Sequence, residues 1–102
     1  MISRQWRGIV RPDRAATYLE HLRTETFPQL SRMDGFLKAS VLRRTVATGV
    51  EFLIVTEWES AKAIAQFAGA DIDRAVVPEN VRQMMIEYDD TVRHYEVVPV
   101  DA

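Results

Sequence analysis

A run of apolar residues in the middle of the chain limits the possible folds more than any other feature. Phe52-Leu53-Ile54-Val55 lies inside Val50 to Trp58, a segment rich in strand-forming residues. Neighbouring side chains of a strand point to opposite faces of the sheet, so this run places large apolar groups on both faces. Such a strand is typical of a sheet that is covered on both sides. The chain therefore needs a covering layer on each face of its sheet.

Other segments of the chain are also predicted to be strands. Ile2 to Val10 comes first and ends before Pro12-Asp13. Phe36 to Val46 precedes the central segment and is joined to it by Ala47-Thr48-Gly49, a short glycine-containing loop that predicts a β-hairpin. Thr91 to Val100 is expected to be the last strand.

The segment that follows Asp13 is predicted to be a helix that ends at Asp34-Gly35. Pro28 lacks the N–H that would bond to Thr24 and crowds that carbonyl, so we expect a kink or a break near Thr26-Phe27. Residues spaced three and four apart, all apolar except Thr26, define one face of this helix, namely Ala15, Leu19, Leu22, Thr26, Leu30 and Met33.

A second helical region follows the central strand. Ser60 is predicted to cap a helix that begins at Ala61, and Gly69 is predicted to end it. Asp71 to Val77 is compatible with one or two further helical turns. Pro78 suits the first position of another short helix, Glu79 to Ile86.

The order of these elements predicts the fold class. The sequence β-α-β-β-α-β is satisfied by one α+β domain over residues 1–102, a ferredoxin-like four-stranded antiparallel sheet with helices on one face. Leaving the other apolar face in water would cost about 1.5–3 kcal/mol for each large side chain. We therefore expect a homodimer that packs through the sheet face. The alternative is a monomer with an unusually apolar surface.

Composition excludes several function classes. The net charge is −2 and the 13 basic residues form no dense run beyond Arg43-Arg44, so we expect no nucleic-acid partner. No stretch approaches the roughly 20 apolar residues that span a bilayer, and Met1 to Arg7 does not have the pattern of a signal peptide. The absence of cysteine excludes thiolate chemistry and fits a cytoplasmic location.

Three segments resemble a known family. Trp6-Arg7-Gly8, the stretch from Phe52 to Ser60, and His94-Tyr95-Glu96-Val97 are similar to the antibiotic biosynthesis monooxygenase-like proteins of the dimeric α+β barrel superfamily. This resemblance implies a ligand pocket between sheet and helices in each subunit. It also implies cofactor-free oxygenation of electron-rich aromatic polyketides or quinols, or haem degradation.

The residues that the family's known enzymes use are replaced in this chain. Those enzymes carry an asparagine in the first strand and a tryptophan on the second helix, and the haem-degrading branch adds a histidine iron ligand. The resemblance assigns these positions to Trp6, Phe67 and Val77. Because valine cannot ligate iron, we do not expect haem degradation.

Two functions therefore stay open. The first is a cofactor-independent monooxygenase that acts on a small aromatic or polyketide-like substrate. The second is a non-catalytic dimeric module that binds a small hydrophobic or aromatic ligand. Neither requires a cofactor, and with two histidines and no cysteine we expect no metal site.

The two histidines are the candidate catalytic residues. His94, in the predicted last strand, is a candidate general base near neutral pH. The alternative is a histidine on the sheet surface that is hydrogen-bonded across strands or across the dimer. His21 precedes Glu25 by four residues, which predicts either a catalytic dyad, if that helix flank borders the pocket, or a solvated surface pair.

The remaining candidates are predicted to line a ligand pocket. Arg4 and Trp6 share one strand face, so Trp6 could stack on a planar ligand while Arg4 binds an anionic group. The alternative for Trp6 is the core or the dimer interface. Tyr18 lies one turn before His21 and could close the same pocket, and Phe67 is predicted to be pocket wall or core.

Overall fold

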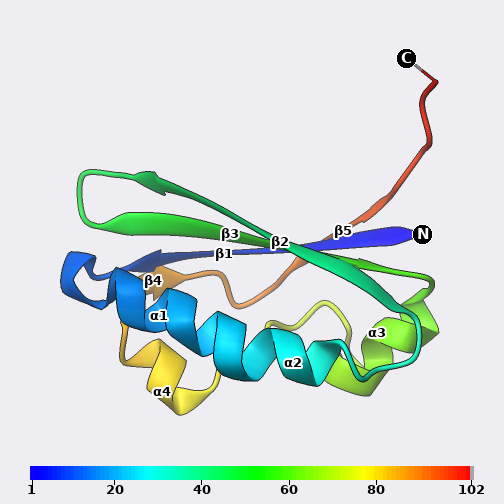
Figure 1. Cartoon of the computed structure of the whole chain (residues 1–102), viewed down its shortest axis with the longest axis horizontal. Helices are drawn as coiled ribbons and strands as arrows, with labels where there is room; N and C mark the ends of the chain where they lie inside the picture. The colour runs from blue at the N-terminus through cyan, green and yellow to red at the C-terminus, as the bar shows by residue number, and fades with distance from the viewer. Residues whose placement is uncertain (102) are drawn as a thin grey trace.

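The computed structural model describes residues 1–101, which form an antiparallel sheet with every helix on one face (Figure 1). The sheet has the order β2-β3-β1-β4, and β5 also pairs with β1. The strands are β1 (Ile2–Val10), β2 (Phe36–Thr45), β3 (Val50–Trp58), β4 (Met85–Tyr88) and β5 (Arg93–Glu96).

β1 lies at the centre of this sheet. It pairs with β3 along its whole length, from Ile2 opposite Trp58 to Val10 opposite Val50. Its other edge is shared, because β4 pairs with Gly8, Ile9 and Val10 whereas β5 pairs with Ile2 to Gln5. Two short strands therefore occupy the position that was predicted for a single fourth strand.

The prediction for residues 79–100 is wrong in two details. The helix α4 is only Glu79–Arg82, and Met85, expected inside that helix, begins β4. The last strand, β5, is shorter than the predicted Thr91 to Val100. Tertiary pairing decides where β4 and β5 begin and end, because the backbone N–H and C=O groups of these strands form hydrogen bonds with the free edge of β1.

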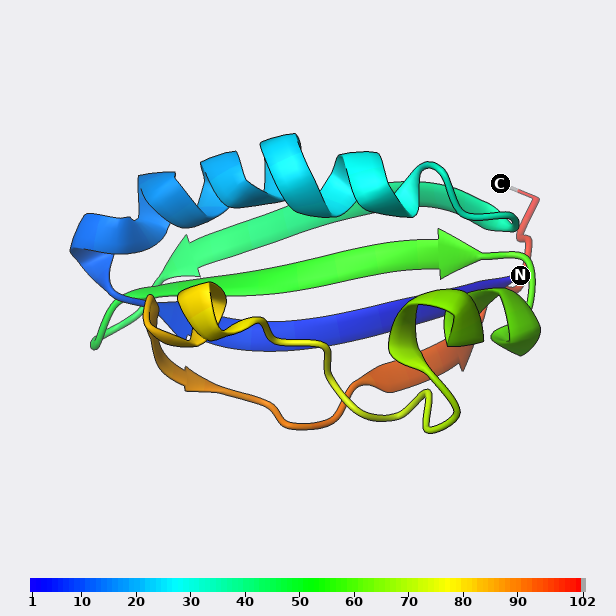
Figure 2. The same cartoon turned by 90° about the horizontal axis from the view of Figure 1, so that it is seen from below.

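The helix before β2 runs without a break from a 3₁₀ turn into α1 (Ala15–His21), a π-helical turn (Leu22–Thr26) and α2 (Phe27–Leu30), as Figure 2 shows. Of the kink or break that was expected near Thr26-Phe27, the break is wrong, and the helix is irregular there instead. The irregularity is a widened turn in which the Phe27 N–H donates to the carbonyl of Leu22. The widened turn lies just before Pro28, so the helix continues through the proline.

The helix after β3 begins and ends where the sequence predicted. α3 spans Ala61–Ala68, the Ser60 hydroxyl accepts a hydrogen bond from the Ala63 N–H at 3.1 Å, and Gly69 follows with φ of +82°. The helical turns expected over residues 71–77 are absent. Residues 70–78, here called the strap, run along the helix side of the sheet. Their one pairing of the strand type is an isolated β-bridge between Arg74 and Thr91.

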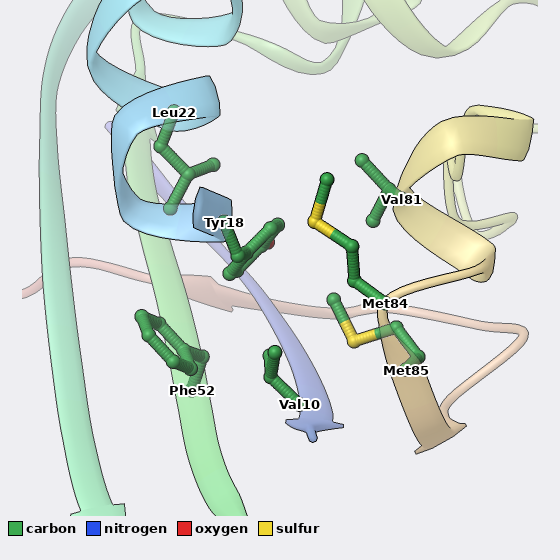
Figure 3. Close-up of a cluster of buried hydrophobic side chains, with 7 residues drawn as sticks. All are labelled: Val10, Tyr18, Leu22, Phe52, Val81, Met84 and Met85. Carbon is green, nitrogen blue, oxygen red and sulfur yellow. The ribbon is translucent and has the colours of Figure 1, made fainter. Parts of the chain in front are cut away.

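Two buried clusters join the helices to the sheet. The larger one is drawn in Figure 3, where side chains from α1, the central strands and the region of α4 point toward one another; it consists of Val10, Tyr18, Leu22, Phe52, Val81, Met84 and Met85. The second, near the other end of the sheet, consists of Leu30, Trp58, Ala63 and Ile64.

No helix of the described chain covers the other face of the sheet (Figure 1). Leu53 and Val55, which alternate with buried Phe52, lie half-buried on it. Charged pairs flank them: Glu51 accepts from both Arg7 and Arg44 at 2.7 Å. The hydrogen bonds from Arg44 and Arg7 lower the pKa of Glu51. This face thus has an apolar centre bordered by ion pairs.

Within residues 1–101, no helix is long and apolar enough to cross a membrane.

Phe52 is completely buried and meets Tyr18 edge-on, with ring centroids 5.0 Å apart. We predict that Phe52→Ala lowers the free energy of unfolding by about 3–5 kcal/mol, because it removes apolar burial and leaves a cavity. Urea denaturation followed by circular dichroism measures this change. Leu37→Ala, at a residue that is 44% exposed, is the matched control and should change stability by less than about 1 kcal/mol. Equal losses in the two variants would contradict this account of the core.

Candidate functional site

A cavity of about 80 Å³ lies between the sheet and the helices. Residues from β1, β3, α1, α3 and the strap line it. The candidate residues that the structure brings together in this lining are Arg4, Trp6, Tyr18, His21 and Phe67. His94 is not in the lining and lies behind Arg4, with which it is hydrogen-bonded.

Strand alternation and helix periodicity explain this arrangement. Arg4 and Trp6 are two residues apart on β1, so both face the helices, and they stand opposite Thr56 and Ile54 of β3. Tyr18 and His21 are three residues apart and share one flank of α1. Phe67 is in the last turn of α3, near the start of the strap.

Arg4 is a buried cation, with only 5% of its surface exposed. Its Nη1 donates to the carbonyl of Ile72 and contacts Nε2 of His94 at 3.1 Å, and its Nη2 donates to the carbonyl of Arg74 at 3.0 Å. The ring of Phe67 lies 5.8 Å from the guanidinium carbon, within the range of a cation–π contact. Arg4 therefore ties the strap to β1.

The charge of Arg4 is not balanced by a contacting carboxylate. Among residues 1–101, no carboxylate lies within ion-pair distance of its guanidinium. Burial lowers the pKa of Arg4 to about 10, and the negative charge of Asp73 acts in the opposite direction. Arg4 thus stays positively charged at neutral pH.

His94 links Arg4 to Asp73. A guanidinium can only donate, so Nε2 of His94 must accept, and the neutral ring then carries its proton on Nδ1. Nδ1 lies 3.2 Å from Oδ1 of Asp73, to which it donates. Both ring nitrogens are therefore engaged, and His94 has no free nitrogen for a substrate while the Arg4 contact is intact.

His21 lies where the cavity opens to the surface. Its side chain is 12% exposed, and Nδ1 lies 3.4 Å from the carboxylate of Glu25. An outer groove of about 330 Å³ between the helix and the strap shares five lining residues with the cavity: His21, Thr26, Phe67, Val76 and Pro78. Glu25 lines this groove but not the cavity, so the pair stands at the entrance.

Tyr18 and Trp6 are held rigidly. Tyr18 is 2% exposed, and burial raises the pKa of its phenol well above the usual value, so the hydroxyl stays neutral and can donate. The indole N–H of Trp6 donates to the carbonyl of Asp89 at 2.7 Å, and its ring lies 6.3 Å from that of Tyr88. These contacts fix one wall of the cavity.

Sequence reasoning missed several lining residues. Ile54 and Thr56 could have been found, because they lie two and four residues after Phe52 on the same strand and so share its face. Val76 and Pro78 of the strap carried no such signal, since their segment was expected to be helical or to begin a helix.

Residues 1–78 match the family model described as antibiotic biosynthesis monooxygenase. The chain belongs to the antibiotic biosynthesis monooxygenase family. The matched residues include every cavity-lining candidate from Arg4 to Phe67. The resemblance stated from the sequence is therefore confirmed. A comparison with curated proteins finds no significant match.

Solved structures confirm the ferredoxin-like fold of this family member. A candidate antibiotic biosynthesis monooxygenase from Bacillus cereus is 20% identical, with a TM-score of 0.65 over 99% of this chain and 94% of that one. The haem degrader of Mycobacterium tuberculosis with two haems in its active site is 21% identical, with a TM-score of 0.59 and full coverage of both chains. A monooxygenase of Streptomyces coelicolor in complex with nanaomycin D is 16% identical, with a TM-score of 0.62 over 99% and 88% of the two chains.

The position that the resemblance assigns to a haem iron ligand does not suit that role in this family member. Val77, at the position that the resemblance assigns to an iron ligand, packs against the larger core cluster. Among residues 1–101, no group of three or more histidine, cysteine, aspartate or glutamate side chains could hold a metal ion.

The link through His94 should stabilise the strap locally. We predict that His94→Ala speeds amide exchange at Ala75, whose N–H donates to the carbonyl of Asp90 at 2.8 Å, by about 3- to 30-fold. The reason is that Arg4 loses one acceptor and Asp73 loses its donor. Hydrogen exchange followed by NMR measures the rate. Glu96→Ala, at an exposed residue of β5, is the control; similar rates in both variants would contradict this role.

Proposed function

We propose that this protein is a cofactor-independent monooxygenase that acts on a small aromatic or polyketide-like substrate. The observation that carries the proposal is that His21, a potential base, and Arg4, a buried cation, line the same cavity. The aromatic rings of Trp6, Tyr18 and Phe67 supply an apolar surround. Membership of a family that includes monooxygenases supports the reaction class.

The first step is removal of a proton from the substrate. Nδ1 of His21 faces the carboxylate of Glu25, so Nε2 is the nitrogen available to accept a proton from an acidic C–H or O–H group. The positive charge of Arg4 favours the anionic form of the substrate, because a charge that is only 5% exposed is poorly screened by water.

The deprotonated substrate then reacts with oxygen. For an activated CH₂ group, the carbanion adds O₂ and, with the proton returned, gives a hydroperoxide. Loss of water from the hydroperoxide leaves a carbonyl at that carbon. One oxygen atom enters the product and the other leaves as water, so the overall reaction is R₂CH₂ + O₂ → R₂C=O + H₂O. The protein contributes a base, a cation and positioning.

Entry of a substrate requires the cavity to widen. Its closed volume of about 80 Å³ is well below the roughly 300–1,000 Å³ of typical ligand pockets, but it adjoins the outer groove of about 330 Å³. Separation of the strap from the helix would join the two spaces. The small closed volume, and the apolar Trp6 and Phe67 at positions where known enzymes carry polar or catalytic groups, favour the second candidate function, a non-catalytic ligand-binding module.

Oxygen uptake separates these two functions. We predict that the protein consumes oxygen above background with an anthrone-type or quinol substrate, and that His21→Gln lowers the rate by about 10²- to 10⁴-fold, because it removes the base. An oxygen electrode measures the rate. Glu20→Gln, an exposed neighbour on α1 outside the cavity, is the control and should retain full activity. An unchanged rate in His21→Gln would count against the assignment, and no uptake with either substrate would favour the binding module.

We also propose that two copies pack through the uncovered face of the sheet. Its apolar centre contains Leu53 and Val55, and Leu42 and Tyr95 on the neighbouring strands are 52% and 47% exposed. Exposed apolar groups gathered on one face mark interaction surfaces in soluble proteins. A two-fold axis through this face would cover it in both copies.

Light scattering after size exclusion tests this assembly. We predict that the wild-type chain elutes as a dimer and that Leu53→Glu elutes as a monomer, because a charge would be buried at the centre of the interface. Ala61→Glu adds the same charge on the exposed start of α3, on the helix side, and should stay dimeric. A wild-type monomer, or a dimer that survives Leu53→Glu, would disprove the proposed interface.

A further inference from the structure

The buried charge of Arg4 has no carboxylate in contact within the described chain, because Asp73 reaches it only through His94. The other arginines that form ion pairs do so from half-exposed or exposed positions: Arg7, Arg44 and Arg82. Arg4 has only the carbonyls of Ile72 and Arg74, one imidazole nitrogen and the face of Phe67. These neutral groups solvate a charge in part, but a buried ion is far more stable beside a counter-ion.

The hydrogen bonds of Arg4 leave part of its guanidinium unused. A guanidinium has five N–H groups, and three are directed at Ile72, Arg74 and His94 through Nη1 and Nη2. Within residues 1–101, the Nε–H forms no hydrogen bond, and no fully buried side-chain nitrogen lacks a partner. The Nε atom is therefore not fully enclosed. An arginine Nε–H beside an Nη N–H is the kind of fork that binds a carboxylate.

The rest of the lining determines what carries the negative group. Trp6, Tyr18, Ile54 and Phe67 present apolar surface, mostly aromatic, to the same cavity. Burial raises the pKa of the Tyr18 phenol, so its hydroxyl is a neutral donor that suits an anion. A flat ring with an ionised group at one end matches this combination of walls and charge.

We infer that the inner end of the cavity is an anion site, and that its ligand is an aromatic carboxylate held by Arg4. This inference rests on the proposed function in that it concerns the same cavity, and it adds the class of substrate. The carboxylate binds Arg4, and the ring extends past Trp6 toward His21 into the space that the widened cavity shares with the outer groove. The reacting carbon of a substrate would then lie on the ring, on the side of His21.

Titration with a matched pair of small probes tests the inference without any turnover. Benzoate and benzamide have nearly the same shape, but only benzoate is charged. We expect benzoate to bind at least about tenfold more tightly, as charge-assisted bidentate hydrogen bonds exceed neutral ones. Two-dimensional ¹H–¹⁵N NMR follows the binding at the two tryptophan indole signals. Trp6 lines the cavity, whereas buried Trp58 is outside the lining, so the Trp6 signal should shift more.

Variants then assign the preference to Arg4. Arg4→Gln should remove the difference between benzoate and benzamide, and Arg4→Lys should keep part of it, because lysine retains the charge but not the fork. Arg32→Gln removes the same charge from an exposed position and should preserve the preference. The comparison of the two probes on the wild-type protein needs no variant, so it stands even if Arg4→Gln fails to fold.

The outcomes separate this inference from the oxygenase proposal. Equal binding of the two probes, a benzoate shift that spares Trp6, or a preference that persists in Arg4→Gln would overturn the anion site, whatever the oxygen uptake. Preferential binding of benzoate in a protein without oxygen uptake would support the site while contradicting the proposed reaction.

Discussion

Three of the other four strands of the sheet, β3, β4 and β5, pair with β1. Its length is matched by β3 on one side, and β4 and β5 divide the other side between them. The chain between these two short strands stays close to β1, since the Asp89 N–H donates to the carbonyl of Arg7 at 3.0 Å. The carbonyl of Asp89 in turn accepts from the Trp6 indole. The backbone of Asp89 thereby holds Trp6 of β1 in place as a wall of the cavity.

Arg4 connects this framework to the site. Its guanidinium holds the strap through two carbonyls and, through His94, reaches Asp73. The strap supplies Val76 and Pro78 to the cavity and to the outer groove, so the residue that fastens this wall is also the positive charge inside it. Burial of an arginine among neutral acceptors costs stability. A ligand anion would recover part of that cost, which gives the cavity a physical reason to prefer negative ligands.

The two histidines differ in a way that their sequence positions do not reveal. His94 is hydrogen-bonded on both nitrogens, whereas His21 has one nitrogen near Glu25 and lines the cavity. The spacing of His21 and Glu25 was compatible with a solvated pair or with a pair at a pocket, because helix periodicity defines a face but not what covers it. The strap and α3 decide which it is, and both are distant from His21 in the sequence.

Local patterns in the sequence were sufficient for much of the fold. Three features depend only on neighbouring residues: the alternation along Val50 to Trp58, the loop at Gly49 and the cap at Ser60. For this reason β3, the hairpin and α3 could be predicted. Alternation also placed Arg4 and Trp6 on one face. The family match over residues 1–78 agrees with these local signals.

Tertiary structure alone decided the remaining features. Met85 begins a strand because the edge of β1 is free to pair with it, and the strap is irregular because its carbonyls bond to Arg4 and its amides to the chain near Asp90. The partners of these backbone groups lie far away in sequence, so no local pattern encodes them. The sequence by itself thus determined which residues of a strand share a face. Only the folded chain determined that Arg4 is buried without a carboxylate in contact and that His21, rather than His94, lines the cavity.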